Sequence, residues 1–330
     1  MKIIVDAFGG DNAPQVPVAA AVAAAENSDV EIILVGKEDK INELLLKYPK
    51  RSGKISVHNA PEVITNNERP AIAVREKRNS SIVVGASLLR EGAGDAFVSA
   101  GNTGALLAAA LTGVGRIKGI RRPALAAVLP SERGGVLLLD CGANVGCRPE
   151  DLKSFAVMGS IYMKKLMDID SPAVALLSNG QEEEKGDETV RASHELLKNA
   201  DINFIGNIEG RDIMSGDADV VVCDGFGGNI ALKSIEGTAS MIAREIKGIF
   251  KKNIFSLLAA LMVKGSLDSF KKKFNYKEYG GAPLLGIKKP VIKAHGSSDA
   301  DSFALCIKQA EKWVERNVNA EIEEAASEKA

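Results

Sequence analysis

Short apolar runs followed at once by glycine and small polar residues recur along the chain. The runs lie at residues 3–5, 96–98, 136–139, 174–177, 220–222 and 291–292, and similar runs without such a loop lie at residues 30–35, 55–57 and 123–129. Most of the glycine-containing loops are followed by an Ala-rich or amphipathic stretch of helical length. This repeated strand, loop and helix predicts an α/β fold in which a parallel sheet is sandwiched between layers of helices.

The length and the cysteines limit the domain count and the compartment. A chain of 330 residues can hold one large domain or two ordinary ones, and the single repeating pattern favours one domain over residues 1–330. Its four cysteines are scattered without a C-x-x-C pair, which is typical of a reducing cytoplasm. The formal charge of -1 gives no reason to expect a nucleic-acid partner.

Loops at the carboxyl ends of parallel strands line the crevice where open α/β sheets bind ligands. Six such loops here carry glycine together with asparagine, aspartate or serine. Glycine lets backbone N–H groups approach a ligand closely, and the N-terminus of the following helix favours negative charge. One loop of this kind is common in any β–α turn, but six of them together predict an anion-binding site.

Several common catalytic signatures are missing from the sequence. It has no G-x-x-x-x-G-K-[ST], no G-x-G-x-x-G after a strand, no H-E-x-x-H and no G-x-S-x-G. ATP hydrolysis, Rossmann-type NAD binding, zinc proteolysis and α/β-hydrolase chemistry are therefore disfavoured. We expect neither a metal nor an organic cofactor.

Acyl transfer from a thioester to phosphate is compatible with these loops, because phosphate is already an anion and a thiolate leaves readily. The reaction needs cations and N–H donors around phosphate and donors aimed at the developing oxyanion. The candidate donors are Asn102, Asn144 and Asn229, and the candidate cations are Lys185, Arg75 and Lys293.

Three of the candidate residues also have simpler interpretations. Lys185 follows three glutamates and could belong to a solvated charge run. His295 could bind phosphate or act as an acid, but it could also be a hydrogen-bonded structural histidine. Cys141 directly follows a strand, but no histidine lies near it in the sequence to activate a thiolate. We therefore do not expect Cys141 to be a nucleophile.

A long amphipathic helix is predicted over residues 241–263, within an arm that spans residues 241–276. Lysines flank its apolar residues, a pattern that suits an anionic membrane surface, although a dimer or core helix would show the same spacing. The residues expected to contact the membrane are Ile254, Phe255, Leu257, Leu258 and Leu261.

The loop motifs resemble, in order and spacing, those of the bacterial phosphate acyltransferases. The matching segments are residues 6–14, 99–105, 140–144, 177–186, 224–229 and 294–299, and the resemblance runs from residue 1 to about residue 316. Phe8 departs from the family, which often has Met at this position.

The resemblance implies reversible transfer of a fatty acyl group from acyl carrier protein to inorganic phosphate, giving an acyl-phosphate for phospholipid synthesis. It implies a homodimer with a fold akin to phosphotransacetylases and to isocitrate or isopropylmalate dehydrogenases. It also implies a cytoplasmic protein at the inner face of the cell membrane, acting with a membrane glycerol-3-phosphate acyltransferase.

Lys185 and Asn229 are implied by the resemblance to be catalytic, facing each other across the dimer interface with Lys185 on phosphate and Asn229 on the thioester carbonyl. The expected substrate-binding and phosphate-binding residues are Asp6, Gly10, Asn12, Arg75, Asn102, Thr103, Asn144, Asp224, His295 and Ser297.

Three alternatives stay open at this point. A phosphotransacetylase acting on short-chain acyl-CoA has a related fold, and an NAD-dependent decarboxylating dehydrogenase would need a cluster of metal-binding aspartates. A lipid-binding or carrier-binding module that uses only the arm would not be an enzyme.

Overall fold

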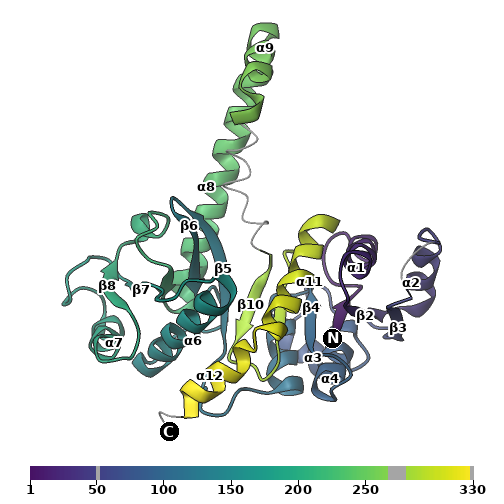
Figure 1. Cartoon of the computed structure of the whole chain (residues 1–330), viewed down its shortest axis with the longest axis horizontal. Coiled ribbons are helices and arrows are strands. Elements are labelled where there is room, and N and C mark those ends of the chain that lie inside the picture. Colours follow the sequence, from purple (N-terminus) through teal and green to yellow (C-terminus); the bar gives the residue numbers. More distant parts are fainter. Residues whose placement is uncertain (50–52, 267–279, 328–330) are drawn as a thin grey trace.

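One sheet of eleven strands forms the centre of the molecule (Figure 1). The computed structural model describes residues 1–49, 53–266 and 280–327, without the side chains of Leu257 and Leu258. The strands are β1 (Lys2–Asp6), β2 (Glu31–Gly36), β3 (Ile55–Asn59), β4 (Ala96–Ser99), β5 (Ala124–Ser131), β6 (Gly134–Leu139), β7 (Val174–Leu177), β8 (Phe204–Ile208), β9 (Val220–Val222), β10 (Ala282–Leu285) and β11 (Val291–Lys293).

The sheet consists of two parallel groups that run in opposite directions. In the order β3-β2-β1-β4-β11-β10-β5-β6-β9-β7-β8, the first five strands are parallel to one another, and so are the last four. Between the groups, β10 is antiparallel to both β11 and β5, and β5 is antiparallel to β6. The expected α/β fold is confirmed, but the sheet is mixed where a parallel one was predicted.

Two strands escaped the sequence analysis. β8 lies at one edge of the sheet and is only partly buried, so its sequence lacks a continuous apolar run. β10 contains Pro283 and directly follows two glycines, a composition more typical of a loop than of a strand. Pro283 belongs to the half of β10 that pairs with β11, whereas Leu284 and Leu285 pair with β5, so the β5 ladder does not need the N–H that proline lacks.

Helices cover both faces of the sheet. They are α1 (Gln15–Asn27), α2 (Glu38–Leu45), α3 (Pro70–Glu76), α4 (Ser81–Arg90), α5 (Thr103–Ala109), α6 (Pro149–Met167), α7 (Glu188–Lys198), α8 (Gly225–Lys251), α9 (Ile254–Met262), α11 (Ala300–Glu315) and α12 (Val318–Ser327). Helices α1, α6, α11 and α12 contribute to the core on one face, and α3, α4 and α5 to the core on the other. Alternating residues of the central strands enter the two cores, as Ile3 and Ile4 of β1 do.

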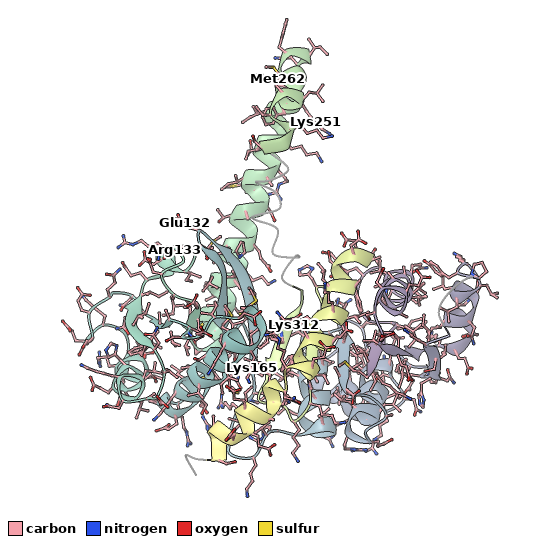
Figure 2. The ribbon with its side chains drawn as sticks, viewed as in Figure 1. Glu132, Arg133, Lys165, Lys251, Met262 and Lys312 are labelled. Carbon is pink, nitrogen blue, oxygen red and sulfur yellow. The ribbon has the colours of Figure 1, made fainter. Side chains whose placement is uncertain are left out.

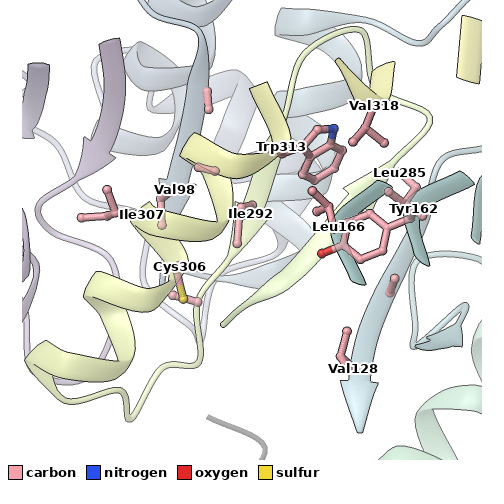
Figure 3. Close-up of a cluster of buried hydrophobic side chains, with 14 of the residues drawn as sticks. Val98, Val128, Tyr162, Leu166, Leu285, Ile292, Cys306, Ile307, Trp313 and Val318 are labelled. Carbon is pink, nitrogen blue, oxygen red and sulfur yellow. The ribbon is translucent and has the colours of Figure 1, made fainter. Parts of the chain in front are cut away.

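The core against α6 and α11 contains the largest buried side chains (Figure 3). The rings of Tyr162 and Trp313 meet edge to face with their centroids 5.7 Å apart. Gln309 Nε2 donates to the Tyr162 hydroxyl at 2.7 Å, and burial raises the pKa of this phenol. Trp313 Nε1 donates to Asn319 Oδ1, so both buried polar groups have partners.

The predicted amphipathic helix differs from the observed one in its bounds. Helix α8 begins at Gly225, well before residue 241, and ends at Lys251, and a second helix, α9, follows after a break. The break comes at Asn253, whose Oδ1 accepts from Ser256 N at 2.8 Å and caps α9. The two helices project together from the body, with Met262 near the tip and Lys251 below it (Figures 1 and 2).

Of the predicted arm, residues 241–276, the structure describes residues 241–266. Residues 267–276 of the prediction, and the side chains of Leu257 and Leu258, lie outside the described part of the chain. In the described residues, no helix is both long enough and apolar enough to cross a bilayer.

Candidate functional site

A cavity of about 300 Å³ lies where the two strand groups meet. Loops that follow β4, β6 and β11 and the first turns of α8 all contribute to it, through Thr103, Gly142, Asn229 and His295. One wall comes from β5 and is apolar, with Leu125, Ala127 and Leu129 among its residues. Four of the six loops singled out in the sequence therefore reach one cavity. Its lining is polar on the side of these loops and apolar on the side of β5.

The 140–144 loop is organised by one buried carboxylate. Asp140 accepts hydrogen bonds from the backbone N–H groups of Leu125, Gly142, Ala143 and Asn144 at 2.8–3.2 Å. Burial raises the pKa of Asp140, and these hydrogen bonds oppose that rise. The carboxylate fixes the backbone that carries Gly142 to the cavity.

Helix α8 begins in direct contact with this loop. Gly225 N donates to Asn144 O at 2.7 Å, and Asp224 caps the helix by accepting from Gly227 N at 2.8 Å. A Cβ atom added to Gly228 would lie 1.9 Å from Asp140 O, so only glycine allows this approach. The glycines in the loop after β9 are thus explained by packing of the helix start.

Asn229 directly follows Gly228 in α8 and lines the cavity opposite Gly142. The ideal Cβ position of Gly142 is 3.6 Å from Asn229 Oδ1. Across the residues that the structure describes, the Asn229 amide has no hydrogen-bond partner. This amide is exposed and can donate to a ligand in the cavity.

The loop after β11 brings His295 and Ser298 to the cavity. Ser297 N donates to His295 Nδ1 at 3.2 Å, which leaves Nδ1 unprotonated, so a neutral ring carries its proton on Nε2. Ser297 Oγ is also 2.9 Å from Nδ1. Ser298, which the sequence analysis did not select, is buried and lines the cavity, whereas Ser297 does not.

Lys293 ends strand β11 and lines the same cavity. Its Nζ donates to Ala100 O at 3.2 Å and to Ala294 O. Burial lowers the pKa of Lys293 to about 8. The lysine therefore reaches the cavity from the first group of parallel strands, whereas the loop that carries Gly142 reaches it from the second group.

A second cavity of about 110 Å³ adjoins the first. It shares Thr103, Leu125, Gly142 and Lys293 with the larger cavity and is otherwise mainly apolar. The remaining lining residues are Gly104, Leu106, Leu107, Ala143 and Leu284.

Several predicted ligand residues hold the loops in place. Asp6 is fully buried, accepts from Ser99 Oγ at 2.6 Å, and has its pKa raised by that burial. Asn102 caps α5 through Ala105 N at 3.0 Å. Asn144 Nδ2 donates to Pro123 O and to Asp140. With Asp224 on α8, these side chains are occupied by the protein itself and support the residues that face the cavity.

Other predicted residues lie away from the cavity lining. Gly10 and Asn12 border a narrow crevice that also contacts His295 and Ser298. Arg75 is exposed near the end of α3, which packs against α5. Lys185 is exposed in the loop between β7 and α7 and does not line the cavity that contains Asn229. Within one chain, Lys185 and Asn229 are therefore not brought together.

Cys141 borders the cavity but is poorly suited to nucleophilic attack. Its Sγ donates to Leu138 O at 3.2 Å, and burial raises its pKa above the ordinary thiol value. A raised pKa keeps the group a thiol near neutral pH, in line with our expectation.

The sequence analysis also missed the cavity residues that follow Asn229 along α8 and those in β5. Lys233 and Glu236 form an ion pair at 2.7 Å, and Leu232 lies beside them. Residues 229, 232, 233 and 236 have the spacing of one helix face, and this spacing could have indicated that they line the same cavity. In the described ranges, no group of three or more His, Cys, Asp or Glu could hold a metal ion.

The comparisons with known proteins agree with the resemblance. A family model described as "Fatty acid synthesis protein" matches residues 1–321. A phosphate acyltransferase of Thermoanaerobacterium thermosaccharolyticum is 50% identical over 323 residues, covering 98% of this chain and 96% of that protein. A phosphate acyltransferase of Bacillus licheniformis is 48% identical over 332 residues, covering 100% and 99%.

Solved structures share the fold at low sequence identity. A phosphotransacetylase from Streptococcus pyogenes has a TM-score of 0.65 and 20% identity, covering 95% of this chain and 94% of that one. A structure described as a 4-hydroxythreonine-4-phosphate dehydrogenase from Salmonella typhimurium has a TM-score of 0.54 and 12% identity, covering 94% and 98%. The expected likeness to phosphotransacetylase and dehydrogenase folds is thus confirmed. Because the family model and these relatives match over nearly the whole chain, the chain belongs to the phosphate acyltransferase family of fatty acid synthesis proteins.

Proposed function

We propose that this enzyme transfers a fatty acyl group from acyl carrier protein to inorganic phosphate, giving an acyl-phosphate for phospholipid synthesis. The observation that carries the proposal is the cavity in which the uncommitted Asn229 amide faces Gly142 beside an apolar wall of β5. Such a site offers hydrogen-bond donors to polar reacting atoms and an apolar surface to an acyl chain.

The reaction needs no protein nucleophile. A phosphate oxygen forms a bond with the thioester carbonyl carbon, and the carbonyl oxygen becomes an oxyanion. When this intermediate collapses, the C–S bond breaks, and the carrier thiolate leaves with the electron pair and is protonated by solvent. Asn229 Nδ2 is placed to donate to the oxyanion, and His295 lines the same cavity.

A homodimer would bring Lys185 to the site. Lys185 lies outside the cavity of its own chain, while the surface next to Asn229 exposes Phe226 and Ile230 by 61% and 51%. Exposed large apolar side chains beside a ligand cavity support a subunit interface there. In this arrangement Lys185 of one subunit would neutralise phosphate bound beside Asn229 of the other.

The composition of the arm supports peripheral binding of the enzyme to the anionic inner face of the cell membrane. Ile254, Phe255 and Leu261 are 62%, 78% and 63% exposed, and exposed lysines of α8 flank them. An apolar tip with a lysine fringe suits anionic lipid. This placement would deliver acyl-phosphate to a membrane glycerol-3-phosphate acyltransferase.

The direct test is the phosphate-dependent release of free thiol from palmitoyl-carrier protein by the purified enzyme. We expect release to require both enzyme and phosphate and to produce a hydroxylamine-reactive acyl-phosphate. Turnover of acetyl-CoA without turnover of the palmitoyl-carrier protein would instead establish a short-chain phosphotransacetylase. No thiol release from either donor would contradict both assignments.

A further inference from the structure

Lys293 lies at the junction of the two adjoining cavities. Of the four residues that both cavities share, Thr103, Leu125, Gly142 and Lys293, only the lysine carries a charge. The larger cavity has the polar lining of Asn229 and His295, and the smaller one is mainly apolar. A cation at this junction can therefore contact an anion in the polar part while an apolar chain occupies the other.

The hydrogen bonds of Lys293 go only to neutral groups. Two hydrogen bonds from Nζ go to the carbonyl oxygens of Ala100 and Ala294, which are neutral. An ammonium group has three donors, so one remains for a ligand. Within the residues that the structure describes, no carboxylate forms an ion pair with Nζ within 4.0 Å. A partly buried ammonium whose hydrogen-bond partners are all neutral favours an anion as its remaining partner.

The charged groups around Lys293 come from several elements. Asp6 at the end of β1 and Asp11 in the next loop favour the charged form, whereas Lys233 of α8 opposes it. Cys306 of α11 also faces the lysine, and burial raises the pKa of its thiol to about 12, so it is neutral near pH 8. His295 follows in the same loop. Desolvation outweighs the two aspartates, which is why the pKa of Lys293 is lowered.

We propose that Lys293 binds the attacking inorganic phosphate at the junction of the two cavities, a role that rests on the proposed acyl transfer. Lys293 stays protonated throughout and donates to a phosphate oxygen, while another phosphate oxygen attacks the thioester carbonyl beside Asn229. The lysine is a binding and orienting cation supplied by the same chain as Asn229. It would act together with Lys185, which the proposed dimer supplies from the other subunit.

The first test compares two lysines of the same strand region. Lys293→Met keeps the side-chain length and removes the charge, and we expect the KM for phosphate to rise about 10- to 100-fold, as for one charge-assisted hydrogen bond. The KM for acyl carrier protein should stay within about twofold, because a charge at the phosphate is not used to dock the carrier. The control is Lys289→Met, since Lys289 Nζ donates to Gly94 O at 3.1 Å and does not line either cavity.

The pH dependence gives a second readout. Lys293 is charged below about pH 8 and neutral above it, so the KM for phosphate of the wild-type enzyme should rise as the pH passes through about 8. Lys293→Arg keeps its charge over this range, so the rise should disappear in that variant. An unchanged phosphate KM in Lys293→Met, or the same alkaline rise in Lys293→Arg, would overturn the proposal.

A third measurement needs no variant and does not depend on turnover. Reductive methylation of the wild-type enzyme, followed by peptide mass spectrometry, should modify Lys293 more slowly with inorganic phosphate present, while Lys289 is unaffected. Protection without any acyl-phosphate production would uphold the anion site and contradict the proposed function. Normal acyl-phosphate production without protection would leave the function intact and reject Lys293 as its phosphate ligand.

Discussion

Two asparagines that follow strands in the same pattern end in different environments. Asn144 gives its Nδ2 hydrogens to Pro123 O and Asp140, whereas the Asn229 amide faces the cavity with no partner among the residues described. At the residue scale, the sequence predicts that both are near the site. Which of them can donate to a substrate depends on contacts from β5 and the 140–144 loop.

We predict that alanine impairs catalysis at one of these positions and stability at the other. Asn229→Ala should lower kcat about 100- to 1000-fold, as loss of one oxyanion donor does, and change stability little. Asn144→Ala should lower the free energy of unfolding by about 1–3 kcal/mol, because it leaves buried acceptors unpaired. Steady-state kinetics and urea unfolding of both variants provide the measurement. A catalytic defect in Asn144→Ala at full stability would contradict this division of roles.

At the scale of elements, the start of helix α8 is the contact that positions Asn229. The helix can begin where it does only because Gly225 and Gly228 allow the backbone to approach the 140–144 loop. The sequence predicted a glycine-rich loop after β9, but these glycines lie inside helix α8, which begins at Gly225. Their conformational role is close packing, not a turn.

Two glycines of α8 offer a matched comparison. Gly228→Ala should destabilise the fold by about 2 kcal/mol or more and abolish activity, because its Cβ would clash with Asp140 O. Gly237→Ala should stabilise it by about 0.5–1 kcal/mol, since Gly237 is exposed in the same helix and its Cβ would meet nothing within 4 Å. Thermal unfolding of the two variants would show the contrast. Equal unfolding midpoints would refute the packing argument.

The helical arm is the other element with a testable role. Phe255→Glu should weaken cosedimentation with anionic vesicles and leave activity in solution nearly unchanged, because Phe255 is 78% exposed on the arm. Leu46→Glu is the control, since Leu46 is 77% exposed on the body of the protein. Normal sedimentation of Phe255→Glu, combined with loss of the dimer in light scattering, would show that the arm forms a subunit contact instead.

At the scale of the whole molecule, the sheet determines which loops meet. Its two parallel groups run in opposite directions, and β5 and β10 join them by antiparallel pairing. The cavity lies at this junction and takes residues from both groups. Lys185, on the loop after β7, lies outside it in the single chain, which is why the proposed catalytic pair requires two subunits.

A mixing experiment tests the two-subunit site. Lys185→Ala and Asn229→Ala should each be inactive, and a refolded equal mixture should recover about a quarter of wild-type activity, because half of the dimers contain one intact site of two. Activity of the mixture is measured against each variant refolded alone. If the mixture stays as inactive as its components, the two residues do not act across subunits.

The sequence by itself determined the α/β class, most of the strands and the loops that carry the polar residues, because strand and helix periodicities are local properties of the chain. Only the tertiary structure decided that β5 and β10 are antiparallel, that Pro283 lies in a strand, and that Asn102, Asn144 and Asp224 hold loops while Asn229, Lys293 and Ser298 reach the cavity. These outcomes depend on contacts between segments that are distant in the sequence. A polar side chain after a strand is available to a ligand only if no such contact has already used its donors and acceptors.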